Sequence, residues 1–281
     1  MARTKIEYCD ETINWYTGCR NGCSYCYARR MAHRLNHIPC TVYWRVGILT
    51  SSAPDDYGKP FEPAVHLDVR AREYNRLLKE KPRRIFLGSM GDICFEGKAI
   101  TYDCGPDGIE LQPRDEWWDS ERLQNDVACI CAALKYSPKG GHEFLVLTKR
   151  PDLLASSAPW SNNVRLGVSV TGNADAHRVP ELIAASGGFK AAWDEDGPLL
   201  WASVEPLLDP DFDPSCLEGL GWVAVGLQTG PGAPAKWTEQ RKKLEDAAKR
   251  VAGWCKEHGV AVFVKGNVGW KWCPQQHPGR E

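Results

Sequence analysis

The chain has 281 residues and a formal net charge of −1, with 43% hydrophobic and 25% charged residues. This composition is ordinary for a folded globular protein, and the charge excludes a global positive field that would draw the chain to nucleic acid. There is no run of eighteen apolar residues, and the polar start MARTKIEYCDET has no signal-peptide core. We therefore expect a cytoplasmic protein with no membrane partner.

Short apolar runs alternate with stretches of helical pattern along the chain. In chain order we predict a small hairpin (42–49 with 64–67), a helix (69–81), a strand (84–89), a helix (120–136), strands (144–148 and 164–170), a helix (174–186), strands (199–204 and 222–227), a helix (235–258) and a strand (260–264). Near-continuous apolar strands indicate a parallel sheet covered by helices. The fold class is thus α/β, a partial or complete (β/α) TIM-like barrel formed by one domain, 1–281.

Polar residues follow six of the predicted strands. They are Ser89 and Asp92, Thr148 and Lys149, Ser169 and Thr171, Glu205, Gln228 and Thr229, and Lys265. The carboxyl ends of barrel strands carry the active site, so these residues predict a shared polar mouth. The segment 94–117 is rich in Gly, Pro and acids, and we expect it to be a lid or substrate loop over that mouth.

Three cysteines lie close together in the stretch TGCRNGCSYCYARRMAHRL, residues 17–35. Cys19, Cys23 and Cys26 have the spacing Cys-x3-Cys-x2-Cys, and in a reducing compartment thiolates at this spacing suit an iron–sulfur cluster or zinc. A structural zinc site needs a fourth ligand, for which the nearest candidates are His33, His37 and Cys40. The alternative is a [4Fe–4S] cluster with three protein ligands and one open iron.

The cysteine spacing is the signature of radical S-adenosylmethionine enzymes, and the chain resembles that superfamily. The segments KIEYCDETINWYTGC, RRIFLGSMGD, FLVLTKRPDLL, NVRLGVSV, HRVPELI, VEPLL and HGVAVFVKG further resemble an uncharacterised phage-associated family distantly similar to spore photoproduct lyase. The resemblance implies a partial barrel with a [4Fe–4S] cluster on Cys19, Cys23 and Cys26. It also implies S-adenosylmethionine on the open iron, an external electron donor such as flavodoxin, and a 5′-deoxyadenosyl radical that abstracts hydrogen from a substrate.

The same resemblance implies a set of cofactor-binding residues, namely Tyr25, Ser89, Asp92, Lys149 and Ser169. Tyr25 is expected near the adenine. The turn GSMGD replaces the Gly-Gly-Glu-like segment of the superfamily, which makes Ser89 and Asp92 the candidates there. Ser169 is expected at the ribose hydroxyls or the carboxylate. Lys149, with Arg150, is expected to counter a carboxylate or phosphate, or else to form a structural salt bridge.

We assign Glu205, Gln228 and Lys265 to the substrate side, as candidate catalytic residues, because they end the later predicted strands. The phage-associated family has Gly-Gly-Glu-Ser-Gly where this chain has GLQTG, and Lys-Gln-Trp-Gly where it has KGNVG. These departures indicate a changed substrate. The alternative for Glu205 and Lys265 is a structural ion pair.

The phage association favours a modified thymine-like base or nucleotide in phage DNA hypermodification, inside the host cytoplasm, by lyase, isomerase or other radical chemistry. Stacking on such a base is predicted for four tryptophans near basic residues: Trp117, Trp118, Trp270 and Trp272, with Arg114 and Lys271. The alternative is that these rings pack against the barrel rim. One alternative is a radical enzyme for a small molecule. Another is a non-catalytic metal-binding nucleic-acid module.

Overall fold

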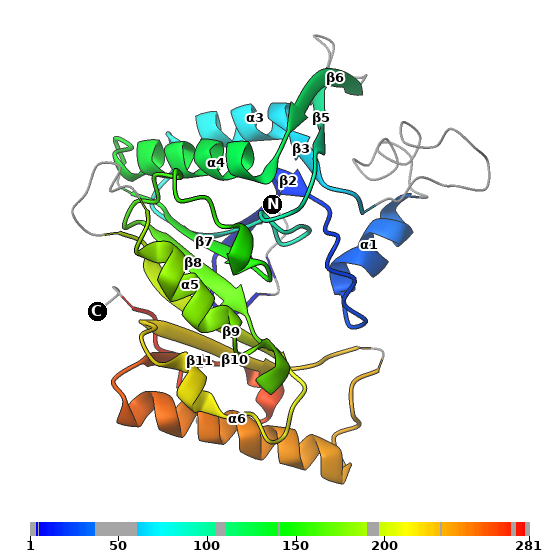
Figure 1. Ribbon diagram of the computed structural model, residues 1–281, viewed down its shortest axis with the longest axis vertical. Coiled ribbons are helices and arrows are strands. Elements are labelled where there is room, and N and C mark those ends of the chain that lie inside the picture. Colours follow the sequence, from blue (N-terminus) through cyan, green and yellow to red (C-terminus); the bar gives the residue numbers. More distant parts are fainter. Residues whose placement is uncertain are drawn as a thin grey trace.

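A seven-stranded parallel sheet organises the chain in the computed structural model, which describes residues 4, 6–36, 61–104, 111–139, 141–189, 197–230, 232–270 and 274–278 (Figure 1). In sheet order the strands are β1 (Glu11–Ile13), β4 (Arg84–Leu87), β7 (Glu143–Thr148), β8 (Val164–Ser169), β9 (Leu199–Leu207), β10 (Trp222–Leu227) and β11 (Ala261–Val264). In the described part of the chain β1 and β11 are the two ends of this sheet. The barrel is therefore partial.

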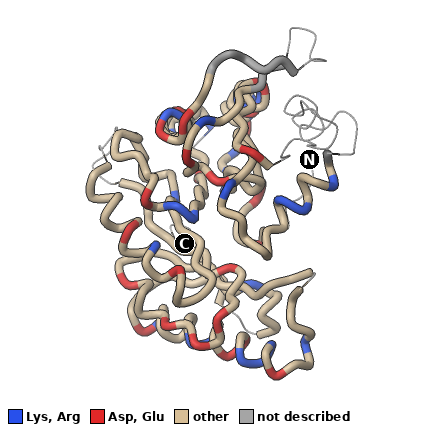
Figure 2. Tube along the Cα trace, turned by 45° about the vertical axis from the view of Figure 1, so that its right-hand side comes forward, with Lys and Arg blue, Asp and Glu red and all other residues tan. Residues whose placement is uncertain are grey.

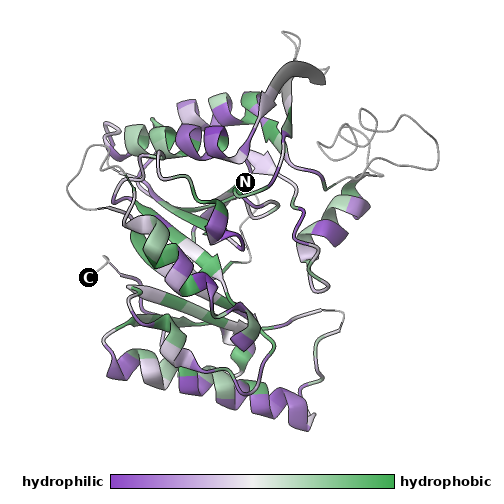
Figure 3. Ribbon diagram, in the orientation of Figure 1, coloured by the Kyte–Doolittle hydropathy of each residue, from purple (hydrophilic) through white to green (hydrophobic). Residues whose placement is uncertain are grey.

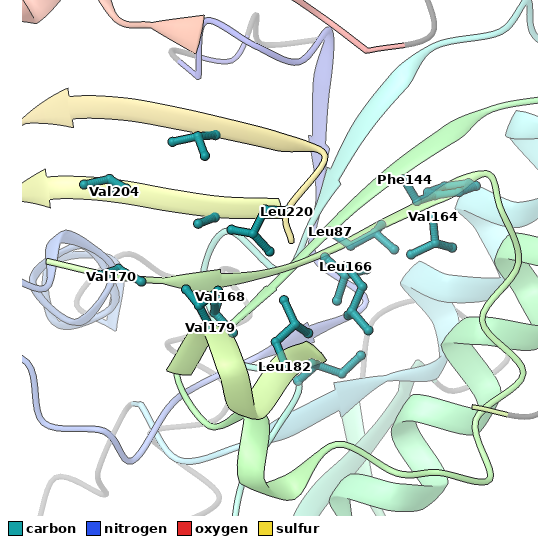
Figure 4. Packing of buried hydrophobic residues seen from close by; sticks show 14 of the residues in the cluster. Leu87, Phe144, Val164, Leu166, Val168, Val170, Val179, Leu182, Val204 and Leu220 are labelled. Atoms are coloured by element: carbon teal, nitrogen blue, oxygen red, sulfur yellow. The ribbon is translucent and has the colours of Figure 1, made fainter. Parts of the chain in front are cut away.

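Four helices cover one face of the sheet: α3 (Leu67–Leu77), α4 (Ser120–Lys135), α5 (Arg178–Ser186) and α6 (Glu239–Glu257) (Figure 1). The sheet is hydrophobic where these helices pack, and their outer sides are hydrophilic (Figure 3). Close to α5, Val168 of β8 and Val204 of β9 are buried with Leu182 of the helix (Figure 4). The apolar runs of the sequence thus supply one side of a two-layer core.

Capping side chains define where two of these helices begin. Asp119 accepts a hydrogen bond from the backbone of Arg122 at the start of α4 (2.8 Å), and Thr238 accepts one from Arg241 at the start of α6 (3.2 Å). Such caps satisfy backbone donors that the first helical turn leaves without partners. Short 3₁₀ helices lie in three connections and after the last strand: η1 (Pro151–Leu153), η2 (Asn173–Asp175), η3 (Pro214–Leu217) and η4 (Gly266–Val268).

A second sheet of four strands lies beside the first: β2 (Tyr16–Thr17), β3 (Ala64–His66), β5 (Ala99–Cys104) and β6 (Leu111–Trp118), in this order. Much of the segment 94–117 therefore forms β5 and β6, which pair antiparallel. The partner expected for 64–67, residues 42–49, lies outside the described residues, and β3 pairs with β2 and β5.

The other face of the large sheet is filled near the strand beginnings by aromatic side chains. Tyr8, from the segment before β1, meets the rings of Trp201, Trp222 and Phe263 at centroid distances of 5.9, 5.6 and 5.7 Å with steep interplanar angles. Edge-to-face geometry of this kind is favourable for aromatic pairs. This cluster closes the lower part of the concave face and leaves the strand ends for the polar residues.

The six strands and four helices predicted for the barrel are present, with boundaries shifted by a few residues, and the predicted strand 64–67 corresponds to β3. The strands β1, β2, β5 and β6 were not predicted. The first two have only three and two residues, too few for a periodic signal, and β6 contains Pro113, which reads against a strand.

Candidate functional site

The strand ends of the large sheet place alternate residues on its concave face. In β9, Ala202 and Val204 belong to the helix-covered core, whereas Trp201 belongs to the aromatic cluster on the other face. Side chains alternate between faces along a strand, so Ser203 and Glu205 continue the concave face above Trp201. The same alternation places Lys265 of the segment after β11 above Phe263. Glu205 and Lys265 of the predicted mouth therefore lie on the same face of the sheet.

The three cysteines lie on the loop between β2 and α1 (Tyr27–Asn36), which we call the cysteine loop, residues 18–26. All three thiols are half-buried. The backbone N–H of Asn21 donates to the Cys19 sulfur at 3.4 Å, and that of Arg29 donates to the Cys26 sulfur at 3.3 Å. Burial raises the pKa of the Cys19 thiol to about 12, and the nearby charges of Asp92 and the two other thiols act in the same direction.

The cysteine loop packs directly against the turn GSMGD that follows β4. Gly18 and Gly91 form a parallel bridge, and the Gly18 carbonyl accepts from the Asp92 backbone N–H at 3.1 Å. Gly18 has a φ of +85°, and a Cβ there would lie 2.1 Å from the Glu62 carbonyl oxygen. Only glycine fits this position, so the contact between loop and turn depends on it.

Ser89 of the same turn is held by two residues from the N-terminal part of the chain. Its hydroxyl donates to the Asn14 amide oxygen at 3.2 Å, and its carbonyl accepts from the Tyr27 hydroxyl at 2.6 Å. Asn14 also accepts from the Met90 backbone at 3.1 Å. The turn is thereby fixed between the end of β1 and the start of α1.

Asp92 is buried and accepts hydrogen bonds on both carboxylate oxygens. Oδ1 accepts from the Thr148 hydroxyl (2.7 Å) and the Cys94 backbone (3.1 Å), and Oδ2 accepts from the Asn21 amide (2.8 Å) and the Lys149 backbone (3.0 Å). Burial raises the pKa of Asp92, and the bonds from Thr148, Cys94 and Lys149 oppose that rise. Four donors occupy the lone-pair sites of a carboxylate, so Asp92 joins the cysteine loop to the ends of β4 and β7.

Tyr25 extends from the cysteine loop towards the ends of β7 and β8. The Lys149 ammonium lies 5.4 Å from the centre of its ring. Burial raises the pKa of Tyr25, the Cys23 thiol adds to the rise, and a side-chain hydrogen bond with Thr171 opposes it. Since Thr171 follows β8, the loop reaches across the mouth to the middle of the sheet.

On the far side of the mouth, Glu205 and Lys265 form an ion pair, with side chains 17% and 13% exposed. Burial raises the pKa of Glu205, although the charge and hydrogen bond of Lys265 oppose this. Lys265 also lies 5.9 Å from the Tyr8 ring centre. At Gly226, a Cβ would lie 2.8 Å from a Glu205 carboxylate oxygen, so the missing side chain makes room for the pair.

The structure places the remaining predicted site residues as follows. Ser169 is buried at the end of β8, and its carbonyl accepts from Arg178 at 2.8 Å. Gln228 follows β10, with its carbonyl accepting from Arg241 at 3.5 Å. Arg150 pairs with Glu96 and Asp152, which is the salt-bridge alternative stated for it above. The mouth residues from β4 to β11 therefore share one edge of the sheet.

Two of the four tryptophans proposed for base stacking are packed into the protein. Trp118 is 4% exposed and faces the guanidinium groups of Arg70 and Arg122, while Trp270 packs against the core. A fully buried ring has no free face to offer a base, so the stacking assignment of Trp118 is wrong, whereas Trp270 is half-buried and its assignment stays a prediction. Trp117 is 56% exposed, and Trp272 lies outside the described residues.

The sequence interpretation missed Asn14, Asn21 and Tyr8. Asn14 follows the three-residue strand β1, which periodicity does not reveal, and Asn21 lies inside the cysteine loop. Tyr8 precedes the first strand in a polar stretch, with no local pattern to show that it is buried. The one usable signal for Asn14 is that it ends a strand, as the predicted mouth residues do.

A cavity of about 290 Å³ opens beside the edge strand β1, behind the turn. Its lining includes Asn14, Thr17 and His66. The His66 ring lies 2.9 Å from the Thr17 hydroxyl, and burial lowers the pKa of His66 to about 4. The cavity adjoins the back of the site, whereas the mouth is formed by the strand ends.

Within the described ranges, no group of three His, Cys, Asp or Glu side chains is arranged to hold a metal ion. Of the three candidate fourth ligands for zinc, His37 and Cys40 lie outside the described residues, so the zinc alternative is not tested. An iron–sulfur cluster binds each thiolate at a different iron, which leaves the sulfurs farther apart than around one zinc ion. Three half-buried thiols on one loop, two of them accepting backbone N–H groups, fit the donor set of such a cluster.

The fold and the mouth define a partial (β/α) barrel protein with a cysteine loop at the carboxyl ends of its strands. The family described as "Protein of unknown function (DUF5131)" matches residues 3–102 and 119–279, and the chain belongs to that family. No curated protein matches the sequence. Among the described residues, no helix has the length and apolar character needed to cross a bilayer.

Among solved structures, the chain is similar to mutants of spore photoproduct lyase. A cysteine-to-alanine mutant with dinucleoside spore photoproduct is 13% identical with a TM-score of 0.47, and the match covers 89% of this chain and 74% of that one. A tyrosine-to-phenylalanine mutant is 14% identical with a TM-score of 0.44, at the same coverage of both chains, 89% and 74%.

Proposed function

We propose that this protein is a radical S-adenosylmethionine enzyme whose [4Fe–4S] cluster is held by Cys19, Cys23 and Cys26. The observation that carries the proposal is the Cys-x3-Cys-x2-Cys loop docked at the carboxyl edge of a parallel half-barrel, with its thiols half-buried. A bound cluster, reduced by a donor such as flavodoxin, would supply one electron to break the sulfonium C–S bond of S-adenosylmethionine, giving methionine and the 5′-deoxyadenosyl radical.

The residues between the loop and the middle strands bind and orient the cofactor. Tyr25 offers a ring to the adenine, and Lys149 beside it offers a positive charge to a carboxylate. Ser89, in the turn after β4, and Ser169, at the end of β8, supply hydroxyls to the cofactor. Asp92 acts through the groups that it holds, because its oxygens already accept four hydrogen bonds. We therefore revise its predicted role from ligand contact to positioning.

The later strands face the substrate. Glu205, Gln228 and Lys265 lie across the mouth from the cysteine loop, with the Glu205–Lys265 pair above the aromatic cluster. The aromatic cluster below excludes water from the concave face, as radical chemistry requires. We assign the substrate to the nucleobases, as a modified thymine-like base or nucleotide in phage DNA hypermodification. The reaction takes place in the cytoplasm, that of the host if the chain is phage-encoded.

Anaerobic reconstitution with iron and sulfide tests the class. The expected result is one [4Fe–4S] cluster per chain, seen by absorption and electron paramagnetic resonance, and release of 5′-deoxyadenosine under a reductant. Cys23→Ala should lose the cluster and keep the fold. Cys216→Ala is the matched control, since Cys216 is another half-buried free thiol, on η3.

Full iron content in Cys23→Ala would overturn the ligand assignment. A cluster that forms but releases no 5′-deoxyadenosine would favour a non-catalytic metal-binding nucleic-acid module. Product analysis with oligonucleotides and with free nucleotides separates a polymer substrate from a small molecule.

A further inference from the structure

Helix α1, directly after the cysteine loop, carries a concentrated positive charge that the proposed chemistry does not use. Arg29, Arg30, His33 and Arg34 lie on this helix, and it contains no acidic residue. Figure 2 shows blue segments along it with no red one between them. The whole chain has a net charge of −1, so this charge is a local feature.

Among the described residues, Arg29, Arg30 and Arg34 form no ion pair that would explain their presence on the helix. Arg30 donates to the Tyr25 carbonyl at 3.4 Å, Arg34 donates to the Met31 sulfur at 2.8 Å, and Arg29 lies 6.0 Å from the Phe61 ring centre. Within the described part of the chain, Arg30 and Arg34 have no carboxylate partner, and both are exposed.

Two features of this arrangement work against the helix, although His33 and Arg34 lie in its last turn, where positive charge is favourable. Arg29 and Arg30 lie in the first turn, next to the positive end of the helix dipole. Arg30 and Arg34 are four residues apart on the same side, and like charges at that spacing repel. A sequence that breaks local rules without a structural gain is typical of a binding surface.

On the opposite side of the mouth, the connection from β10 to α6 presents an exposed aromatic ring. Trp237 is 89% exposed, and the nearby Lys236, Lys242 and Lys243 are exposed as well, beside one exposed acid, Glu239. This connection leaves the carboxyl end of β10, the edge at which the cysteine loop follows β1 and β2. Figure 1 shows α1 and this connection on the same side of the molecule.

We infer that α1 and the Trp237 connection bind a single-stranded polynucleotide across the mouth. Arg30 and Arg34 contact phosphates, and Trp237 stacks on a base. Trp237 favours a single strand over a duplex, since an exposed ring can stack only on a base that is not already stacked between its neighbours in a double helix. The inference deepens the proposed function and rests on it for one step, the entry of a base from the bound strand into the mouth.

Binding of fluorescein-labelled oligonucleotides of about twelve nucleotides, within the range of single-strand sites, tests the inference by anisotropy over a salt series. The three probes are oligo-dT, oligo-rU and duplex DNA of the same length. Arg30→Ala/Arg34→Ala should reduce the steepness of log K against log salt by about 1.4, from roughly 0.7 per lost contact. Relative to 1 M salt, that change lowers the affinity at 0.1 M salt about 25-fold. Trp237→Ala should reduce affinity on the order of 5- to 100-fold with an unchanged slope.

Matched controls lie at the opposite edge of the sheet, where the strands begin. Lys79→Ala/Lys81→Ala removes two exposed charges before β4, and Tyr136→Ala removes a ring that is 63% exposed after α4. Both should bind as the native chain does. The inference is overturned if the controls lose as much affinity as the mouth variants, or if duplex binds as tightly as the single strands.

A higher affinity for oligo-dT than for oligo-rU, or the reverse, reports whether the natural strand is DNA or RNA. Either preference supports the proposed binding surface. The titrations are run on metal-free and on reconstituted protein. Loss of cluster assembly together with the predicted binding pattern would remove the radical chemistry and keep the surface. Normal 5′-deoxyadenosine release with no oligonucleotide binding would keep the radical chemistry and overturn the proposed binding surface.

Discussion

Asp92→Asn is the sharpest test of how the site is held together, because it keeps the side-chain shape and changes only the acceptor. In the native chain Oδ1 and Oδ2 each accept two hydrogen bonds, Oδ2 from Asn21 and from the Lys149 backbone. An asparagine has one oxygen, so in either orientation its NH₂ group faces two donors. The variant therefore loses two hydrogen bonds in a buried position.

The magnitude follows from those two bonds. A hydrogen bond to a charged group contributes about 1.5–3 kcal/mol, which gives about 3–6 kcal/mol for two. Burial disfavours the charged carboxylate, as its raised pKa shows, so we take the lower end of this range. A loss of about 3 kcal/mol lowers the melting temperature of a chain of this size by about 6–12 °C.

Thermal unfolding followed by circular dichroism on the metal-free chain measures this loss, and calorimetric titration with S-adenosylmethionine measures cofactor binding on the reconstituted protein. Asp246→Asn on α6 is the control, since Asp246 is exposed and pairs only with Lys249 among the described residues. It should melt with the native chain. If Asp92→Asn also melts with the native chain but no longer binds S-adenosylmethionine, Asp92 is a ligand contact and the positioning role is refuted.

Three further predictions concern the other groups of the site. Glu205→Gln should lower the free energy of unfolding in urea by about 1–3 kcal/mol, because Lys265 keeps only a neutral partner. The proposed substrate-side role requires that the same variant also loses product formation, so a destabilised variant that still forms product would refute that role. Gly226→Ala should displace the same carboxylate, and its effect should be less than additive with that of Glu205→Gln. The pKa of His66 is about 4 in the folded chain against an ordinary 6.5, so between these two pH values the unfolded chain binds one proton more than the folded chain. The free energy of unfolding should therefore fall by about 3 kcal/mol as the pH drops from 6.5 to 4. Unfolding of His66→Asn over the same pH range should lack that slope, and parallel slopes would exclude His66 as its source.

The proposed cluster ligands were the easiest part of the site to predict. Cys19, Cys23 and Cys26 lie within one short loop, so their spacing along the chain limits where the thiols can lie. The strands β4 and β7–β11 were equally accessible, since an apolar run buried on both faces leaves a pattern in neighbouring residues. Polar residues at their ends then indicated the mouth, because parallel strands bring their carboxyl ends to one edge.

Only the tertiary structure decided what those polar residues contact. Asp92 meets Asn21 and Thr148, which lie 71 and 56 positions away, and Glu205 meets Lys265 across 60. The same residue types at the same strand ends are compatible with a ligand contact or with a protein contact, and packing selects between them. Burial is also a tertiary property, which is why Trp118 and Tyr8 became core residues without any local sign. Spacing along the chain determines which groups are covalently close, whereas sheet order and register determine which distant groups share a face.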